Sequence, residues 1–178
     1  MDVLEAIRTR RSVRQYQARP VDAETLRAVL EAARWAPSWA NTQCTRYTVV
    51  QDPALKAALI DTFSEKNPAR RGAADAPVMV AVSARKGLAG YYHGGPVTDQ
   101  GDAWTMFDVA LAIQNLTLAA HALGLGTVQV GYFDMAKAAR LLEIPPDEVM
   151  VELIPLGWPA HEPAVPARLL MEELVRWR

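Results

Sequence analysis

This chain contains few cysteines and histidines and has almost no net charge, and each of these features excludes a class of proteins. The single cysteine, Cys44, cannot form a disulfide within the chain, and the Arg-rich first 20 residues lack the apolar segment of a secretion signal. We therefore expect a cytoplasmic protein. The three histidines lie far apart, and no Cys pair or His-Glu pair has metal-ligand spacing, so no metal site is expected. A net charge of -1 provides no field that would attract nucleic acid or an anionic membrane.

A membrane-spanning run is also missing. The longest apolar stretch, residues 106–125, is interrupted by four polar side chains, those of Asp108, Gln114, Asn115 and His121. Such side chains are too costly for an unassisted bilayer span. We interpret the stretch as a buried helix from about Thr105 to Leu123. Because it is apolar nearly all round, its far side should meet another large surface, such as a second subunit.

The chain has enough apolar material for one compact domain, since 51% of its 178 residues are hydrophobic. Helix starts are predicted at the acidic residues Asp2, Asp22, Asp52 and Asp134. The second of these helices should end at Pro37 and the third at about Ser64. Strands are predicted at residues 47–50, 77–83, 127–132 and 149–156. Helices thus alternate with strands in a single α+β domain over residues 1–178.

Residues 10–14, Arg-Arg-Ser-Val-Arg, concentrate positive charge near the N-terminus. A phosphomonoester carries roughly -1.5 to -2 charges near neutral pH, which one cation does not balance. Arg10 and Arg14 can share such a group, because a guanidinium binds phosphate oxygens in a bidentate fork, and Ser12 adds a hydroxyl donor. The alternative interpretation is a solvated basic face without a ligand.

Residues 37–43, Pro-Ser-Trp-Ala-Asn-Thr-Gln, form a second polar segment on a turn that begins with proline. The amides of Asn41 and Gln43 each carry a donor and an acceptor, which matches the alternating edge of a pyrimidine-like ring, and Ser38 adds a hydroxyl. Together with the basic segment, this turn indicates a phosphorylated planar cofactor. The alternative is that these side chains only cap the helix and shape the turn.

Three glycines near position 130 do not form a dinucleotide fingerprint. Gly124 and Gly126 follow a helix and enter a strand, whereas the Rossmann phosphate loop follows a strand and opens a helix. Gly131, at the end of an apolar strand, would instead permit close approach of backbone N–H groups to a ligand.

Residues 85–103 contain five glycines and no clear period, so we interpret them as a mobile substrate loop or lid. Tyr91, Tyr92, His93 and the following Trp104 are candidates for stacking on an aromatic substrate, or merely for closing the pocket. The sequence has neither a Gly-x-Ser-x-Gly elbow nor a Walker lysine loop, so the motifs required for serine hydrolysis and for nucleoside triphosphate hydrolysis are absent.

The segments together resemble the nitroreductase family of flavin-dependent oxidoreductases. Residues 10–14 match its Arg-Arg-Ser-x-Arg pattern, and residues 36–43 match its Ala-Pro-Ser-x-x-Asn-x-Gln pattern. Residues 124–127 (Gly-Leu-Gly-Thr) and 156–159 (Leu-Gly-Trp-Pro) resemble later landmarks, so the resemblance covers almost the whole chain. The chain departs from the family at residues 44–45, Cys-Thr in place of Pro-Trp, and at Ala167, where a basic residue is frequent.

The resemblance implies a nitroreductase-like fold with a central mixed sheet flanked by helices, in an intertwined homodimer that binds two FMN at the subunit interface. It places Arg168 with the basic segment around the phosphate, and has Ser38 and Asn41 reach the flavin from the partner subunit. The strand ending at residues 129–132 would point backbone N–H groups at the flavin nitrogen that receives hydride. The predicted cofactor-binding residues are Arg10, Arg11, Ser12, Arg14, Pro37, Ser38, Asn41, Gln43, Gln129, Val130, Gly131 and Arg168.

The implied activity is hydride transfer from NADH or NADPH to FMN, and then to an acceptor such as a nitroaromatic compound or a quinone, in a ping-pong mechanism. No side-chain acid or base is required, so no catalytic residue is assigned. Two alternatives stay open. One is a specialised flavin dehydrogenase or dehalogenase of the same fold, and the other is a non-catalytic FMN carrier or sensor.

Overall fold

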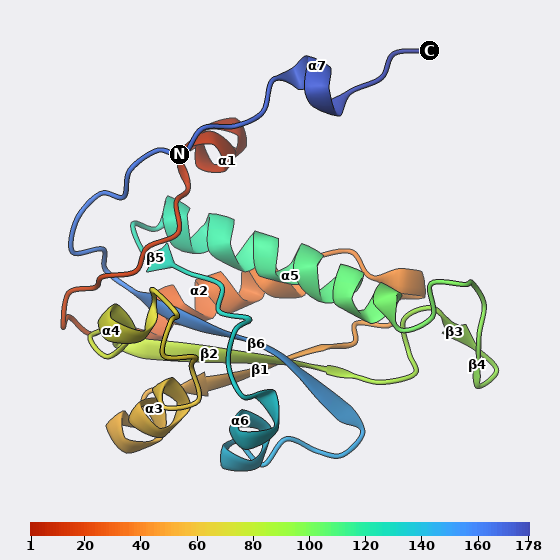
Figure 1. Cartoon of the computed structure of the whole chain (residues 1–178), viewed down its shortest axis with the longest axis horizontal. Helices are drawn as coiled ribbons and strands as arrows, with labels where there is room; N and C mark the ends of the chain where they lie inside the picture. Colours follow the sequence, from red (N-terminus) through yellow and green to blue (C-terminus); the bar gives the residue numbers. More distant parts are fainter.

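A computed structural model describes all residues, 1–178. A four-stranded sheet forms the middle layer, and helices cover both of its faces (Figure 1). Strand β2 (Val78–Arg85) explains this layering, because its alternate side chains enter two separate cores. Val80 and Val82 pack beneath helices α2 (Ala23–Arg34) and α5 (Ala103–Ala122), while Met79 and Ala81 pack towards helices α3 (Pro53–Ile60) and α6 (Met135–Leu141). A strand buried on both faces reads as a continuous apolar run, as β2 does.

The strands lie in the order β1-β2-β6-β5, with β1 at Thr45–Val50, β6 at Glu148–Gly157 and β5 at Gly126–Thr127. The three ladders are antiparallel, and a single parallel bridge between Ser12 and Thr127 makes the sheet mixed, as predicted. The α+β fold class is therefore confirmed.

The strand predicted at 127–132 is wrong for most of its length. Strand β5 stops at Thr127, and only Val130 pairs again, in an isolated bridge with Leu153. The register of β5 against β6 places Val128 opposite Pro155. Proline has no N–H to donate to the ladder, so the pairing is interrupted at this point.

The four predicted helix starts are confirmed. Each capping aspartate accepts a hydrogen bond from the backbone N–H three residues on, over 2.7–2.9 Å, in α1 (Val3–Thr9), α2, α3 and α6. Helix α3 ends at Ile60 rather than near Ser64, because the chain turns there and buries Phe63 in a bridge with Phe133. Helix α2 ends at Arg34, shortly before Pro37.

The helix predicted from about Thr105 to Leu123 is confirmed, because helix α5 has nearly the same bounds. Only one of its faces is buried within the chain, and Met106 and Phe107 on the other face are 45% and 54% exposed. The second surface that the all-round apolar pattern requires is thus not supplied by this chain. None of the helices is both long enough and apolar enough to span a membrane.

Short elements complete the chain. They are the 3-10 helix η1 (Trp39–Asn41), helix α4 (Arg70–Ala73), the paired strands β3 (Tyr91–Tyr92) and β4 (Gly95–Pro96), and helix α7 (Met171–Leu174). The C-terminal segment passes α1 and carries α7 away from the sheet (Figure 1). Its large apolar side chains, those of Leu169, Leu170, Met171, Leu174 and Trp177, are exposed.

Candidate functional site

A basic cavity of about 320 Å³ lies where the N-terminal segment meets the C-terminal segment. Arg10, Ser12, Arg14 and Arg168, the four residues predicted to surround a phosphate, line it together with Arg11, which was predicted to bind the cofactor. The remaining lining comes from Pro163, Ala164 and Pro166, and no carboxylate is among the lining residues. Burial, followed by repulsion from the nearby arginines Arg11 and Arg168, lowers the pKa of Arg10. The cavity is therefore suited to an anion, which would relieve this repulsion.

Local structure explains how these arginines are placed. Arg10 is the C-cap of α1, and the backbone N–H of Val13 donates to the Thr127 carbonyl oxygen at 2.9 Å, which ties the segment to the sheet. Arg11 differs from Arg10 and Arg14, because its Nη1 donates to the carbonyl oxygens of Arg8 (2.7 Å) and Arg10 (2.8 Å), whereas Arg168 makes a single, longer bond of this kind, to Ala167 at 3.4 Å. It satisfies carbonyl groups at the end of α1, and Arg10, Arg14 and Arg168 are better placed to bind a ligand.

The predicted ring-binding turn, residues 37–43, has an unusual backbone. Ala40, Asn41 and Gln43 have φ values of 42°, 56° and 49°, in the left-handed region that favours glycine. Each such residue costs about 1 to 3 kcal/mol and persists only where the surroundings impose it. Within the turn, the Ser38 hydroxyl accepts from the Gln43 backbone N–H at 3.0 Å, and Gln43 Nε2 donates to Asn41 Oδ1 at 3.2 Å.

Asp108 is the residue that sequence reasoning missed as part of this site. It lies in α5, is 2% exposed, and accepts the backbone N–H of Trp39 with both carboxylate oxygens at 3.0 Å. Burial raises its pKa, while the hydrogen bond from Trp39 acts in the opposite direction. The sequence did carry a signal, because a charged residue inside an otherwise apolar helix needs a buried partner.

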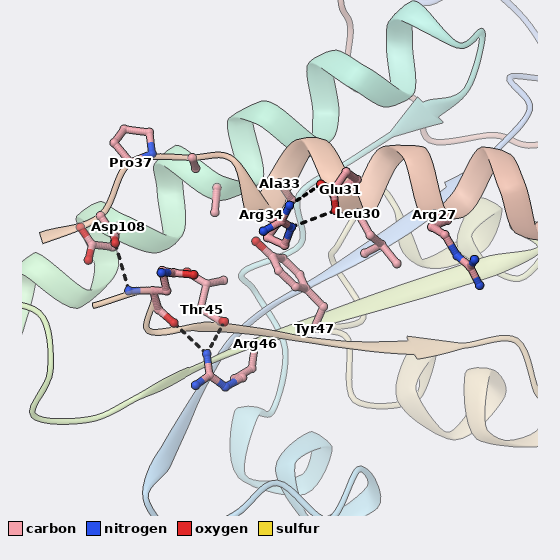
Figure 2. A pocket seen from close by; sticks show the side chains of 14 residues that line it. Arg27, Leu30, Glu31, Ala33, Arg34, Pro37, Thr45, Arg46, Tyr47 and Asp108 are labelled. Atoms are coloured by element: carbon pink, nitrogen blue, oxygen red, sulfur yellow. Dashed lines mark hydrogen bonds and ion pairs between the residues drawn. The ribbon is translucent and has the colours of Figure 1, made fainter. Parts of the chain in front are cut away.

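A cavity of about 390 Å³ opens between α2 and β1, beside this turn (Figure 2). Pro37, Ser38 and Gln43 line it, whereas Asn41 does not. Figure 2 shows the Glu31–Arg34 ion pair of α2 facing Tyr47 of β1 across the cavity, with Pro37 and Asp108 near the other end. The structure thus places three of the four predicted turn residues on one concave surface.

Aromatic side chains line a further cavity of about 380 Å³, which shares Pro37, Ser38 and Asp108 with the cavity between α2 and β1. The rings of Trp39 and Trp104 are 4.6 Å apart, Trp104 and Phe107 are 5.5 Å apart, and Tyr92 lies 6.5 Å from Trp39. Two of the residues proposed for acceptor stacking, Tyr92 and Trp104, therefore pack on the turn. Trp39, Trp104, Phe107 and Leu111 give this cavity an apolar lining.

None of the three candidates of the 85–103 segment lines that cavity, and Tyr91 and His93 lie in other surroundings. The Tyr91 hydroxyl donates to Asp102 at 2.9 Å, which anchors the segment to the start of α5. His93 is exposed and has a φ of 49° in the turn between β3 and β4. The segment is thus a small hairpin with defined bonds, and whether it contacts substrate stays a prediction.

Residues 129–131 present backbone donors at the edge of the sheet. Val130 is buried and exchanges both backbone hydrogen bonds with Leu153, at 3.0 and 3.1 Å. In an extended segment successive N–H groups point in opposite directions, so those of Gln129 and Gly131 point away from β6. They have no hydrogen-bond partner within the chain, and a Cβ atom at Gly131 would meet nothing within 4 Å.

The predicted site residues therefore fall into separate groups. The basic residues and the turn at 37–43 line different cavities. No group of three or more His, Cys, Asp or Glu side chains is arranged to hold a metal ion. The geometry provides an anion cavity, a polar turn beside an aromatic cavity, and two free N–H groups at a sheet edge.

Comparison with known proteins identifies the family of this chain. The sequence profile of the nitroreductase family matches residues 7–158. A protein of Methanothermobacter thermautotrophicus, provisionally named an NADH dehydrogenase/NAD(P)H nitroreductase, is 34% identical over 92% of this chain and 80% of its own length. The 5,6-dimethylbenzimidazole synthase of Rhodospirillum rubrum is 31% identical over 93% of this chain and 86% of its own. The chain belongs to the nitroreductase family.

Solved structures give the same result. The crystal structure of a protein from Desulfovibrio desulfuricans, provisionally described as a nitroreductase and determined in complex with FMN, has 31% sequence identity to this chain. It superimposes with a TM-score of 0.79 and covers 100% of this chain and 97% of its own. The nitroreductase-like fold inferred from the sequence motifs is thus confirmed.

Proposed function

We propose that this protein is an FMN-dependent oxidoreductase that transfers hydride from NADH or NADPH to an acceptor such as a nitroaromatic compound or a quinone, in a ping-pong mechanism. The single observation that carries the proposal is the cavity lined by four arginines and Ser12 without a carboxylate. Family membership supports it, as do the FMN in the D. desulfuricans structure and the name of the M. thermautotrophicus relative.

The donor set of the basic cavity fits the phosphate of FMN. Arg10, Arg14 and Arg168 supply three cations, and a phosphomonoester with roughly -1.5 to -2 charges requires more than one of them. Guanidinium groups bind phosphate oxygens in pairs, and the Ser12 hydroxyl adds another donor. We propose that these four residues bind the phosphate and that Arg11 holds the end of α1 behind them.

The ring of FMN would be held by the remaining predicted residues. Ser38, Asn41 and Gln43 offer hydroxyl and amide groups that match its hydrogen-bonding edge, and Pro37 begins the turn that carries them. The free N–H groups of Gln129 and Gly131, on either side of the paired Val130, would stabilise negative charge on the reduced ring.

A homodimer would bring the two groups of residues together, since they line different cavities of one chain. Several exposed apolar surfaces support this proposal. They are the outer face of α5, the residues Val3, Leu4 and Ile7 of α1, and the apolar side chains of residues 169–177. Exposed apolar patches of this kind mark interaction surfaces. We propose that the partner subunit covers them in an intertwined dimer.

Bound FMN supplies the hydride chemistry, and the protein supplies binding, orientation and exclusion of water. The aromatic cavity beside Ser38 would hold a flat acceptor against the flavin, with Trp39 and Trp104 as its walls. Cys44 has no part in this chemistry, because its thiol is buried and its pKa is raised to about 11. A cytoplasmic location stays a prediction from the sequence.

The visible spectrum tests the proposed function directly. Purified protein is incubated with FMN, desalted and mixed anaerobically with NADH or NADPH. We expect retained flavin bands that bleach with at least one of these donors and return when a nitroarene or quinone is added. Loss of all flavin on desalting would contradict the cofactor assignment.

A second candidate is a specialised flavin enzyme that does not use NAD(P)H, such as a dehydrogenase or dehalogenase. The similarity to 5,6-dimethylbenzimidazole synthase favours keeping it. In the same experiment, this candidate predicts retained flavin bands that neither NADH nor NADPH bleaches. A non-catalytic FMN carrier gives that result as well, and it differs in showing no turnover with any acceptor.

A further inference from the structure

Asp108 connects the long helix α5 to the strained turn at residues 37–43. Its two carboxylate oxygens accept the backbone N–H of Trp39 at 3.0 Å each, and Cys44 Sγ lies 3.7 Å from Oδ2. The carboxylate also lines both cavities that flank the turn, the one shared with Gln43 and the aromatic one shared with Trp104. No other residue of α5 lines both of these cavities.

The turn needs an outside constraint, because its other hydrogen bonds are local. The backbone N–H groups of Asn41 and Thr42 donate to the carbonyl oxygens of Ser38 and Trp39, and the Gln43 N–H donates to the Ser38 hydroxyl. These bonds join residues at most five positions apart and do not fix the turn relative to the sheet or to α5. The bond from Trp39 to Asp108 spans 69 positions of the chain and does so.

Charge makes this bond stronger than an ordinary one. Hydrogen bonds to an ionised carboxylate are roughly twice as strong as neutral ones. Backbone strain such as that at Ala40, Asn41 and Gln43 persists only where surrounding structure over-determines the conformation. The packing of the Trp39 ring on Trp104 adds a second contact with α5, at 4.6 Å.

We infer that Asp108 is a positioning residue, which holds the Trp39 backbone so that Ser38 and Gln43 are presented to the flavin ring in the strained conformation. In this role Asp108 acts on the cofactor through the turn. The inference rests on the proposed function, since it assigns the purpose of the turn to binding FMN.

The first test is Asp108→Asn, which keeps the shape and one acceptor oxygen but removes the charge. We expect FMN affinity of the apoprotein to fall at least tenfold and the visible circular dichroism of the bound flavin to change. Thr117→Val is the matched control, because Thr117 is equally buried in α5 but bonds only within the helix, to the Gln114 carbonyl oxygen. A purely structural role would lower the unfolding temperature of Asp108→Asn and leave affinity and circular dichroism as in wild type, which overturns the inference.

A second test leaves Asp108 in place and removes the donor, in case the Asp108 variant does not fold. Trp39→Pro deletes the N–H at the first position of η1, where proline is tolerated, and Ser38 already has the extended backbone (φ -142°, ψ 159°) that a following proline requires. Trp39→Ala is the control for loss of the ring. We expect Trp39→Pro to bind FMN at least tenfold more weakly than Trp39→Ala, and equal affinities would contradict the inference.

The two levels of proposal fail in different ways. If wild-type protein does not bind FMN, the proposed function fails and this inference fails with it. If wild type binds FMN but Asp108→Asn and Trp39→Pro match their controls, only the inference fails.

Discussion

Ser12 pairs with Thr127 in the single parallel bridge of the sheet, and the bridge fixes the basic segment beside the interrupted edge strand. The proposed phosphate-binding residues are therefore anchored to the same strand that leads to Gln129 and Gly131. A cofactor that spans both groups would be held at two ends by one edge of the sheet.

The first prediction concerns the basic cavity. The double variant Arg10→Ala/Arg168→Ala should lower FMN affinity by about 3 kcal/mol or more, roughly 100-fold, because hydrogen bonds to charged groups contribute roughly 1.5 to 3 kcal/mol each. Fluorescence titration of the apoprotein with FMN measures this. Arg140→Ala, at an exposed position on α6, is the control and should bind as wild type. Unchanged FMN binding in the double variant would contradict the proposal that Arg10 and Arg168 bind the phosphate.

The second prediction uses a glycine that supports Arg14. A Cβ at Gly72 would overlap the carbonyl oxygen of Arg14, so Gly72→Ala must push the basic segment away. Overpacking of this kind costs roughly 1 to 3 kcal/mol. We expect a lower free energy of unfolding in urea together with weaker FMN binding. Gly95→Ala, where the added Cβ meets nothing within 4 Å, should leave both quantities nearly unchanged, and an equal loss in the two variants would contradict the prediction.

The third prediction concerns the buried carboxyl group of Glu152 on β6. Burial raises its pKa from 4.5 to about 7, and its Oε1 has no hydrogen-bond partner. Because the folded state holds the proton more tightly than the unfolded chain, this contribution to stability is complete below pH 4.5 and is lost as the pH rises through about 7. Glu152→Gln should therefore raise the free energy of unfolding at pH 8 by roughly 1 to 3 kcal/mol and have a smaller effect at pH 5. Urea titrations of both proteins at the two pH values measure the difference, and equal effects at both would exclude a titrating Glu152.

The fourth prediction addresses acceptor binding. Trp104→Ala opens the aromatic cavity beside Ser38 and removes the contact with Trp39. Aromatic pairs contribute about 0.5 to 1.5 kcal/mol beyond burial, so KM for a nitroarene should rise several-fold. The rate at which NAD(P)H bleaches the flavin should change little. Trp35→Ala is the control, because Trp35 is 72% exposed and lines neither cavity. A change in bleaching rate without a change in KM would place Trp104 elsewhere in the reaction.

The fifth prediction is that the protein is a dimer at all working concentrations. The exposed apolar residues of the C-terminal segment make up much of the surface available to a partner. Deletion of residues 169–178 should shift the mass measured by light scattering towards the monomer and weaken FMN retention. A catalytically active monomer of the full chain would refute the dimeric site.

Elements of the fold could be predicted from the sequence where a residue acts on its own neighbours in the chain, independently of the rest of the fold. Aspartates placed before apolar segments predicted four helix starts, because each side chain accepts a backbone N–H that the helix leaves free. The continuous apolar run at 77–83 predicted a strand, and the structure buries that strand on both faces. The strand at 127–132 was predicted wrongly, because its pairing depends on Pro155 opposite Val128, which only the register reveals.

The candidate site was predictable in its residue types but not in its assembly. The charge of residues 10–14 indicated an anion site, and the resemblance added Arg168, which the structure brings to the same cavity. The apolar helix around Asp108 indicated that this carboxylate needs a buried partner, but the partner, Trp39, could not be found from the sequence, since the packing of α5 against the turn brings the two together. Long-range contacts of this kind depend on the whole fold and not on local pattern.

The interruption of β5 at Pro155 also bears on aggregation. An edge strand normally exposes a row of N–H and C=O groups on which another chain can add a strand. Here β5 is only two residues long, and on its outer side the Thr127 carbonyl oxygen already accepts the backbone N–H of Val13, so an invading strand has no continuous ladder to extend. The short edge strand and the N-terminal segment that pairs with it thus protect this edge of the sheet from fibril-like association.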